Sequence, residues 1–287
     1  MPIALLAVAT LLAVNVVLGP LGLGVIQWRV SAIGLNQTYG ADGAALVLVV
    51  PSAVAAAWLW HRRARLAPPL TLGVGLATLY YAVASALGPD YARYPGNNER
   101  FVPILLVLIG LSWVVAIRAW AALDAHPPVP AIWLARSLGT VLVVGGAAIG
   151  LAWSKQLFDI AIAGSLTGPD ALAYADAPGA FWLVRVVDLG FIVPICLATG
   201  VGLWRGSPTA VRAAYGIAAF MTLQAASVLA MGTVMLWRQD PTATPTLVYV
   251  LAPVSLGLAL FTARLLASYT ISALPGRSEG AMISGQC

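Results

Sequence analysis

The chain has 287 residues, of which 61% are apolar and only 9% are charged, and its mean hydropathy is +0.91. About 25% of the residues in ordinary soluble domains are charged, so this composition excludes a soluble protein and indicates an integral membrane protein. The two cysteines, Cys196 and Cys287, are expected at different depths and form no C-x-x-C motif. Neither a disulfide framework nor thiol exchange is therefore expected.

Eight apolar segments are long enough to cross a bilayer. A hydrocarbon core of about 30 Å takes roughly 20 apolar residues in a helix, and backbone groups in lipid must find their partners within the protein. Runs this long predict helices, because the strands of a membrane barrel would be segments of about ten alternating residues. The expected fold class is all-α, a polytopic membrane helix bundle. The segments cover residues 3–26, 42–60, 69–88, 101–121, 131–153, 181–203, 211–236 and 246–268.

One membrane domain is expected over residues 1–273, followed by a flexible cytoplasmic tail over residues 274–287. The longest connection, residues 154–180, is too short to fold separately; it is either a cap over an outer cavity or a mobile connector. A short surface helix is expected within it, around residues 156–163. The first segment is expected to be retained, because no basic residue precedes it and its apolar run is too long for a signal peptide.

Basic residues in the short loops predict the orientation. Lys and Arg collect on the cytoplasmic side, and the basic loops alternate correctly if both termini are cytoplasmic and the protein lies in the plasma membrane. The net charge of +5 reflects mostly this sidedness. It gives no case for nucleic-acid binding, because the basic and aromatic interleaving that single strands require is absent. The Arg-for-Lys and Ala-rich composition suggests a bacterial protein. The basic stretches are HRRAR at 61–65, WRGSPTAVR at 204–212 and the tail after Arg264.

The two halves of the chain contain a candidate internal repeat. The sequence reads VPSAVAAAWLWHR from Val50 and VPICLATGVGLWRG from Val193, and both stretches end in Leu-Trp followed by basic charge. Pro51 and Pro194 are 143 positions apart, almost half of the chain. A 4+4 arrangement would make the repeats parallel, related by an axis along the membrane normal. The alternative is chance similarity between two apolar segments.

Arg185 and Asp188 place two charges at the start of the sixth segment, in FWLVRVVDLGFIVP at 181–194. At i and i+3 they share a helical face and can pair with each other. Asp188 is too short to reach the surface, so it should face the bundle interior. In the functional interpretation the pair lines an outward-facing cavity, where Arg185 binds an anionic group and Asp188 holds Arg185 or accepts a proton. In the structural interpretation the pair is an internal salt bridge that fixes helix register.

Three further residues join this candidate ligand site. Asp42 opens the second segment, and Tyr80 and Tyr81 approach the outer end of the third. Asn15 lies near mid-membrane, where amide side chains commonly bond helix to helix. Nine tryptophans, Trp153 among them, fall near predicted segment ends, as expected of interfacial anchors.

The sequence contains no motif of a familiar catalytic or cofactor site. Both histidines, His61 and His126, fall in loops predicted to be cytoplasmic, so no buried haem-ligand pair and no metal site are expected. No P-loop, G-x-S-x-G or Ser-x-x-Lys is present. We therefore expect neither a cofactor nor a metal, and an enzyme is the less favoured interpretation.

The segments TYGADGAALVLVVP, from Thr38, and FWLVRVVDLGFIVP, from Phe181, resemble a group of uncharacterised bacterial multi-pass membrane proteins. In that group a Tyr-Gly-x-Asp opens a span, and an Arg is followed three residues later by Asp-Leu-Gly. The resemblance implies an eight-helix protein and brings no activity with it.

Three functions follow as hypotheses. The leading one is binding or transport of a small or amphipathic ligand through an outward-facing polar cavity. The second is an accessory or scaffold subunit of a membrane complex, in which the charged pair only fixes packing. The third is a lipid-modifying enzyme with Asp188 or Asp42 as acid or base, against which the scarcity of paired acids argues. The expected partners are membrane lipids and a small-molecule ligand, with no nucleic acid; the sequence names no protein partner.

Overall fold

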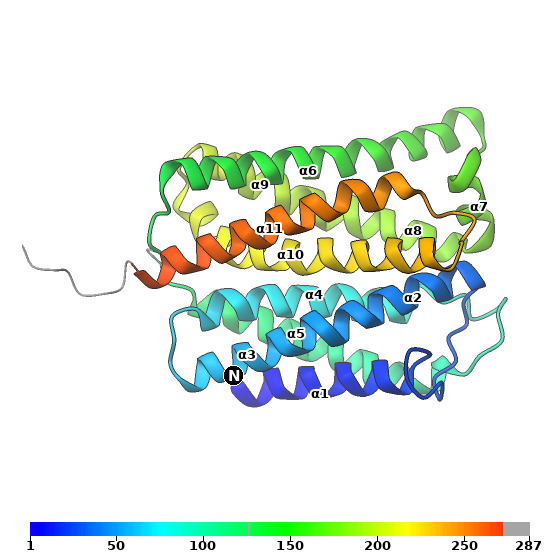
Figure 1. Ribbon diagram of the computed structural model, residues 1–287, viewed down its shortest axis with the longest axis horizontal. Helices are drawn as coiled ribbons and strands as arrows, with labels where there is room; N and C mark the ends of the chain where they lie inside the picture. Colours follow the sequence, from blue (N-terminus) through cyan, green and yellow to red (C-terminus); the bar gives the residue numbers. More distant parts are fainter. Residues whose placement is uncertain (126, 272–287) are drawn as a thin grey trace, which may run out of the picture.

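Prolines mark the starts of the helices. The computed structural model describes residues 1–125 and 127–271, and within them every regular element is helical. Eight helical passes run along the long axis of the bundle (Figure 1). Proline lies in the first turn of most of them, as in α1 (Pro2–Leu18), α4 (Ala67–Leu87) and α5 (Val102–Ala122). At that position its missing N–H is not needed by the helix.

Each pass overlaps one predicted segment, but the second begins at Ala32, well before the predicted start at residue 42, because Ser31 caps α2 (Ala32–Ala44) and the polar stretch that follows is helical. Asp42 therefore lies inside a helix and does not open it. Three of the passes contain a π-helical turn, η1, η3 or η4, and α5 is preceded by the 3-10 turn η2. The elements are α1 (Pro2–Leu18); α2 (Ala32–Ala44), η1 (Ala45–Val49) and α3 (Val50–His61); α4 (Ala67–Leu87); η2 (Asn98–Phe101) and α5 (Val102–Ala122); α6 (Ile132–Phe158) and η3 (Asp159–Ala163); α7 (Gly168–Asp176); α8 (Pro178–Val187), η4 (Asp188–Ile192) and α9 (Val193–Trp204); α10 (Pro208–Trp237); and α11 (Pro245–Ile271).

Within the described residues, seven passes are long and apolar enough to cross a membrane, which confirms the predicted polytopic helical bundle. The remaining pass, α1, has 17 residues and ends at Leu18, whereas the predicted segment ran on to residue 26. The helix stops because Gly19 and Pro20 follow it, and proline cannot continue a helix. A count of eight spans therefore stays a prediction.

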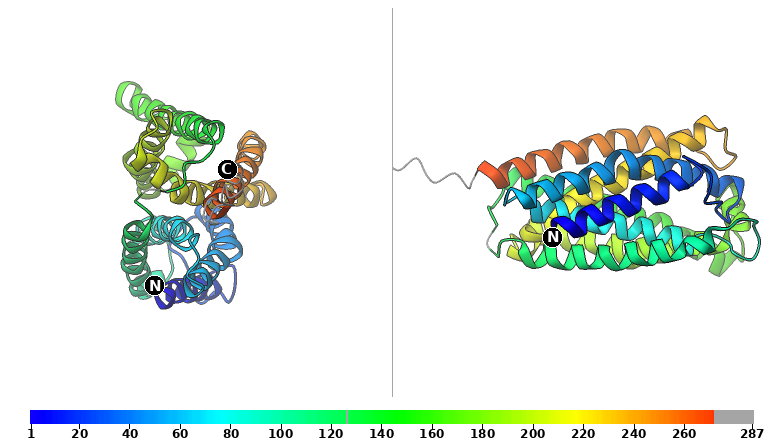
Figure 2. Two further views of the ribbon diagram at one scale, coloured as in Figure 1. Left: turned by 90° about the vertical axis from the view of Figure 1, so that its left-hand side faces the viewer. Right: turned by 90° about the horizontal axis from the view of Figure 1, so that it is seen from below.

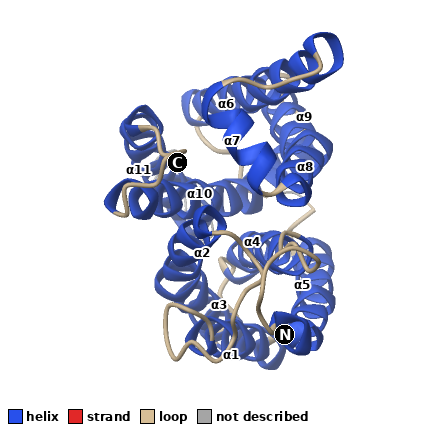
Figure 3. Cartoon of the chain, turned by 90° about the vertical axis from the view of Figure 1, so that its right-hand side faces the viewer, coloured by secondary structure: helices blue, strands red, loops and turns tan. Residues whose placement is uncertain are grey.

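The helices form two groups, α1–α5 and α6–α11, which the end-on views separate (Figure 2, left; Figure 3). They meet where α10 packs against α2 and α4. The crossing of α4 and α10 is close: a Cβ on Gly73 would lie 2.6 Å from Ala219 Cβ, and one on Gly216 would lie 2.4 Å from Leu72 Cδ2. Small residues of this kind let helix backbones approach each other in membranes.

The two Val-Pro stretches share local geometry. The π-helical turns η1 and η4 each directly precede Val-Pro, and α3 and α9 each have 12 residues. Each helix is followed by a left-handed residue, Arg63 (φ 53°) or Gly206 (φ 66°). A π turn accommodates the proline, which lacks an N–H and crowds the carbonyl four residues earlier. A 4+4 repeat predicts such matches, and the repeat itself stays a prediction.

The connection at residues 154–180 is mostly helical, and the expected helix around residues 156–163 is present as a continuation of α6. Helix α6 continues to Phe158 and then through η3 to Ala163. A Lys155–Asp159 ion pair of 2.5 Å bridges one turn of this extension, a spacing that stabilises helices. Gly164, with φ 67°, ends it, and α7 and α8 follow. The predicted tail, 274–287, lies outside the described residues.

The bundle has two ends, which we name the α7 end and the Arg63 end. The α7 end holds α7 and the starts of α2 and α8, on the right of Figure 1. The Arg63 end holds the N-terminus, the α3–α4 turn and the end of α11. The N-terminus and the last described residues therefore lie at the same end.

Candidate functional site

Tyr80 and Tyr81 divide the predicted site residues into two clusters. Tyr80 Oη donates to Asp188 Oδ1 at 3.1 Å, in the C-terminal group of helices. Tyr81 Oη donates to Asp42 Oδ1 at 2.6 Å, in the N-terminal group. Successive side chains of an α-helix point about 100° apart, and α4 packs against both groups. The residues predicted to line one cavity therefore form an Arg185 cluster and an Asp42 cluster.

In the Arg185 cluster, the guanidinium group lies between two aromatic rings. Its carbon is 3.5 Å from the ring centroid of Phe181 and 4.3 Å from that of Trp153. Nε and Nη2 donate to Gln156 Oε1 at 2.9 and 2.7 Å, and Nη1 donates to the Phe181 carbonyl at 3.2 Å. The residue is only 9% exposed. A guanidinium has five N–H groups, so two remain without a protein acceptor among the described residues.

The expected ion pair between Arg185 and Asp188 is not formed. The ion pairs among residues 1–125 and 127–271 are Arg29–Glu99 and Lys155–Asp159. Asp188 instead accepts from Tyr80 on one oxygen and from Trp153 Nε1, at 2.9 Å, on the other. Each charged group forms its hydrogen bonds with other residues, so the charge of Arg185 faces the two aromatic rings and carboxylates at longer range.

Helix α7 joins the two groups of helices above this cluster. The Asp176 carboxylate accepts hydrogen bonds from Ser31 Oγ and, at 3.2 Å, from Tyr94 Oη. Arg93 Nη1 donates to the carbonyls of Ala175 and Asp176 at 2.8 and 3.0 Å. Residues from the N-terminal group thus hold the end of α7, directly before α8 begins. Hydrogen bonds therefore attach the end of α7 to the N-terminal group, and a role of this connection as a cap stays a prediction.

A second set of hydrogen bonds at the α7 end, which we name the Asp240 clasp, joins Asn36 of α2 to Asp240 and Thr242 of the α10–α11 turn. Asp240 Oδ2 accepts from Asn36 Nδ2 at 2.8 Å, and Oδ1 accepts from Thr242 N and Oγ1 at 2.9 and 2.7 Å. Burial disfavours the charged form of Asp240, but these hydrogen bonds outweigh burial and hold its pKa below its usual value. Arg238 lies 4.1 Å from the Tyr39 ring centroid and adds a cation–π contact.

The Asp42 cluster joins three helices of the N-terminal group. Asn15 Nδ2, in α1, donates to Tyr81 Oη at 3.1 Å, and Tyr81 in turn donates to Asp42. Asn15 and Asp42 are 0% and 1% exposed. The amide of Asn15 therefore bonds helix to helix, as expected of amides within membrane bundles. Asn15 Oδ1 and Asp42 Oδ2 are both buried without a donor.

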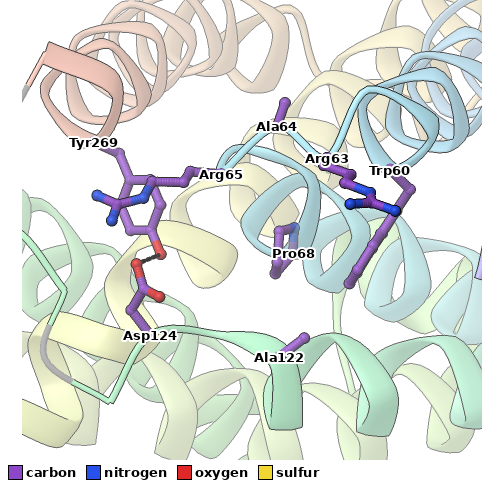
Figure 4. Close-up of a pocket in the computed structure, with 8 residues that line it drawn as sticks. All are labelled: Trp60, Arg63, Ala64, Arg65, Pro68, Ala122, Asp124 and Tyr269. Carbon is purple, nitrogen blue, oxygen red and sulfur yellow. Dashed lines mark hydrogen bonds between the residues drawn. The ribbon is translucent and has the colours of Figure 1, made fainter. Parts of the chain in front are cut away.

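A pocket of about 240 Å³ lies at the Arg63 end, opposite the predicted outward cavity (Figure 4). It sits between the α3–α4 turn, the end of α5 and α11, where Tyr269 Oη donates to Asp124 Oδ2 at 3.0 Å. The sequence pattern HRRAR indicated only orientation, because the pocket depends on the end of α11 approaching the α3–α4 turn, a tertiary relationship that no local signal reveals. Its lining residues are Trp60, Arg63, Ala64, Arg65, Pro68, Ala122, Asp124 and Tyr269.

Neither a metal-binding cluster in the described residues nor a similar known protein indicates a function. Within the described part of the chain, no three His, Cys, Asp or Glu residues gather as a metal site would require. Comparison with protein-family models, with curated proteins and with solved structures finds no significant match. Inference about function therefore rests on the chemistry of the two clusters.

Proposed function

We propose that this is a plasma-membrane protein that binds or transports a small or amphipathic ligand, and that the ligand carries an anionic group. The observation that supports the proposal is the buried guanidinium of Arg185, which among the described residues has no ion-pair partner and leaves two N–H groups without an acceptor. Ionisable residues inside membrane spans are rare and commonly mark ligand pathways.

The neighbours of Arg185 have roles in this proposal. A planar guanidinium can bind a carboxylate or phosphate with two parallel hydrogen bonds. Trp153 and Phe181 hold the plane of the group between their rings, which fixes the direction of its free N–H groups. Tyr80 and Asp188 position Trp153 through its indole N–H. Arg185 is the binding residue, and the others are positioning residues.

The α7 end is proposed to face outward, with both termini in the cytoplasm. Among the residues that the structure describes, one acidic residue, Asp124, accompanies eight basic residues at the Arg63 end, and positive charge collects on the cytoplasmic side. At the α7 end six acidic residues accompany five basic ones. The basic residues of the Arg63 end are Arg62, Arg63, Arg65, Arg118, Arg136, Arg205, Arg212 and Arg264.

A thermal-shift comparison of two additives tests the proposal. The purified protein is melted with a medium-chain fatty acid anion and with the uncharged alcohol of the same chain length. A ligand that binds only the folded state raises the melting temperature, so the anion is expected to stabilise wild type more than the alcohol does. Arg185→Ala should lose this difference, whereas Arg264→Ala, at the opposite end, should keep it. An equal anion effect in folded Arg185→Ala would contradict the proposal.

A scaffold subunit is the second candidate, because Arg185, Gln156 and Asp188 tie α4, α6 and α8 together. A double-mutant cycle between Arg185 and Gln156 separates the two. Strong coupling in stability, combined with an unchanged anion effect, would favour the scaffold.

A further inference from the structure

Asp42 is a carboxyl group inside a membrane-crossing helix without a positive charge in contact. It is 1% exposed, and neither ion pair within residues 1–125 and 127–271 includes it. Removing an ionised carboxylate from water is costly unless a partner and several hydrogen bonds compensate. The only hydrogen bond that Asp42 accepts through its side chain in the described structure comes from Tyr81.

Two buried oxygen atoms of the Asp42 cluster have no hydrogen-bond donor. Asp42 Oδ1 is satisfied by Tyr81, and Tyr81 is satisfied by Asn15 Nδ2. Asp42 Oδ2 and Asn15 Oδ1 are both fully buried acceptors without a donor. A single hydrogen on Asp42 Oδ2 would remove the charge and supply the missing donor.

The surroundings of Asp42 Oδ2 are also oxygen-rich. A Cβ on Gly19 would lie 3.4 Å from this oxygen and 3.2 Å from each of the carbonyl oxygens of Asn15 and Val16. These carbonyls belong to the C-terminal end of α1, which carries the negative end of the helix dipole. The negative end of this dipole disfavours an ionised carboxylate near it and favours a protonated one.

No other ionisable group compensates Asp42 from the elements packed against it. Helix α1 contains no ionisable side chain, and α4 contributes Tyr81, which is already the donor, and Tyr80, which donates to Asp188. Tyr39, on the same helix as Asp42, lies against Arg238. Helix α10 meets α2 where Gly40 approaches the Met231 backbone, and the ionisable residues of α10, Arg212 and Tyr215, lie near its opposite end. The π turn η1, which begins three residues after Asp42, contains only Ala, Leu and Val.

We propose that Asp42 is an exchangeable proton site. A proton taken from water forms the Oδ2–H bond and neutralises the carboxylate, and this hydrogen is shared with Asn15 Oδ1 or with the carbonyls at the end of α1. The reverse step returns the proton to water and restores the carboxylate. The adjoining π turn fits this role, because π turns occur often at functional sites. The site does not depend on Arg185 or on its ligand.

Infrared difference spectroscopy on exchange from H₂O to D₂O at neutral pH tests the proposal. Wild type should show a deuterium-sensitive carbonyl band of a protonated carboxyl, and Asp42→Asn should lack it. Asp188→Asn is the matched control and should retain the band. The absence of any band assigned to Asp42 would overturn the proposal.

A second variant keeps the test decisive if Asp42→Asn fails to fold. Tyr81→Phe removes the hydrogen bond to the carbonyl oxygen, so the same band should stay but move to higher frequency.

A third measurement separates a proton from a metal cation. The melting temperature of wild type should be the same in Na⁺ and in choline at equal ionic strength. A stabilisation by Na⁺ that Asp42→Asn loses would overturn the proton site in favour of a sodium site.

Discussion

Tyr80 and Tyr81, consecutive residues of α4, donate hydrogen bonds to two aspartates that belong to different halves of the protein. One of these aspartates, Asp188, shares its cluster with a buried arginine, and the other, Asp42, has no cation in contact within the described chain. Because α4 also packs against α10, it connects both clusters to the interface between the two groups of helices.

Trp153 is predicted to stabilise the Arg185 cluster through its indole N–H as well as its ring. Trp153→Phe keeps an aromatic face for Arg185 but leaves Asp188 Oδ2 without its donor. Losing one partner of a half-buried carboxylate should lower the free energy of unfolding by about 1–3 kcal/mol. Denaturation in detergent measures this change. Trp182→Phe, whose ring is exposed, is the control and should have little effect.

The crossing of α4 and α10 should not tolerate a larger residue at Gly73. In Gly73→Ala the new methyl group would lie 2.6 Å from Ala219 Cβ, so the helices must separate. Overpacking of this kind typically costs about 1–3 kcal/mol. Gly110→Ala meets no atom within 4 Å and gains up to about 1 kcal/mol from helix propensity. Equal melting temperatures for the two variants would show that the crossing is not close.

Arg63 and Gly206 give a reciprocal test of backbone strain. Both residues are left-handed, with φ of 53° and 66°, a conformation that glycine adopts freely and other residues adopt at a cost. Arg63→Gly is expected to stabilise the protein by about 1 kcal/mol, and Gly206→Ala to destabilise it by a similar amount. Thermal midpoints of the two variants against wild type measure both effects, and a loss of stability in Arg63→Gly would show that its side chain contributes more than the strain costs.

The Asp240 clasp predicts a pH dependence of stability. The folded-state pKa of Asp240 is lowered, so its stabilisation is fully present above the unfolded pKa of about 3.9. It is lost as the pH falls through the folded pKa. Asp240→Asn should therefore lose less stability than wild type between neutral and strongly acidic pH. Hydrogen exchange in the α10–α11 turn reports this locally, and parallel pH profiles for both proteins would contradict the assignment.

Helix positions could be predicted from the sequence because the length of an apolar run determines whether it can cross a bilayer. The predicted segment 69–88 corresponds to α4 (Ala67–Leu87), and the start of α10 coincides with its proline. The first helix was predicted too long, since hydropathy does not register the Gly-Pro that ends α1. The helix at residues 156–163 was not recognised as a continuation of α6. Polar residues between the two segments were interpreted as the end of the membrane-crossing helix.

The residues named from the sequence lie in two polar clusters, an arrangement that the sequence did not predict, and their role in ligand binding stays a prediction. Arg185, Asp188, Asp42, Tyr80 and Tyr81 all lie in polar clusters. That Tyr80 and Tyr81 face different halves depends on α4 lying between them, which is a tertiary relationship. Trp153 was interpreted as an interfacial anchor, and Gln156 was placed at the start of a short surface helix. Their contacts with Arg185 arise because α6 runs on past residue 153, so no local pattern could have identified them.

Native mass spectrometry of gently extracted protein tests the proposed ligand site most directly. Wild type is predicted to carry a reproducible bound mass of an anionic compound, which Arg185→Ala loses and Arg264→Ala retains. A folded Arg185→Ala protein that carries the same mass as wild type would contradict the assignment of Arg185 as the binding residue.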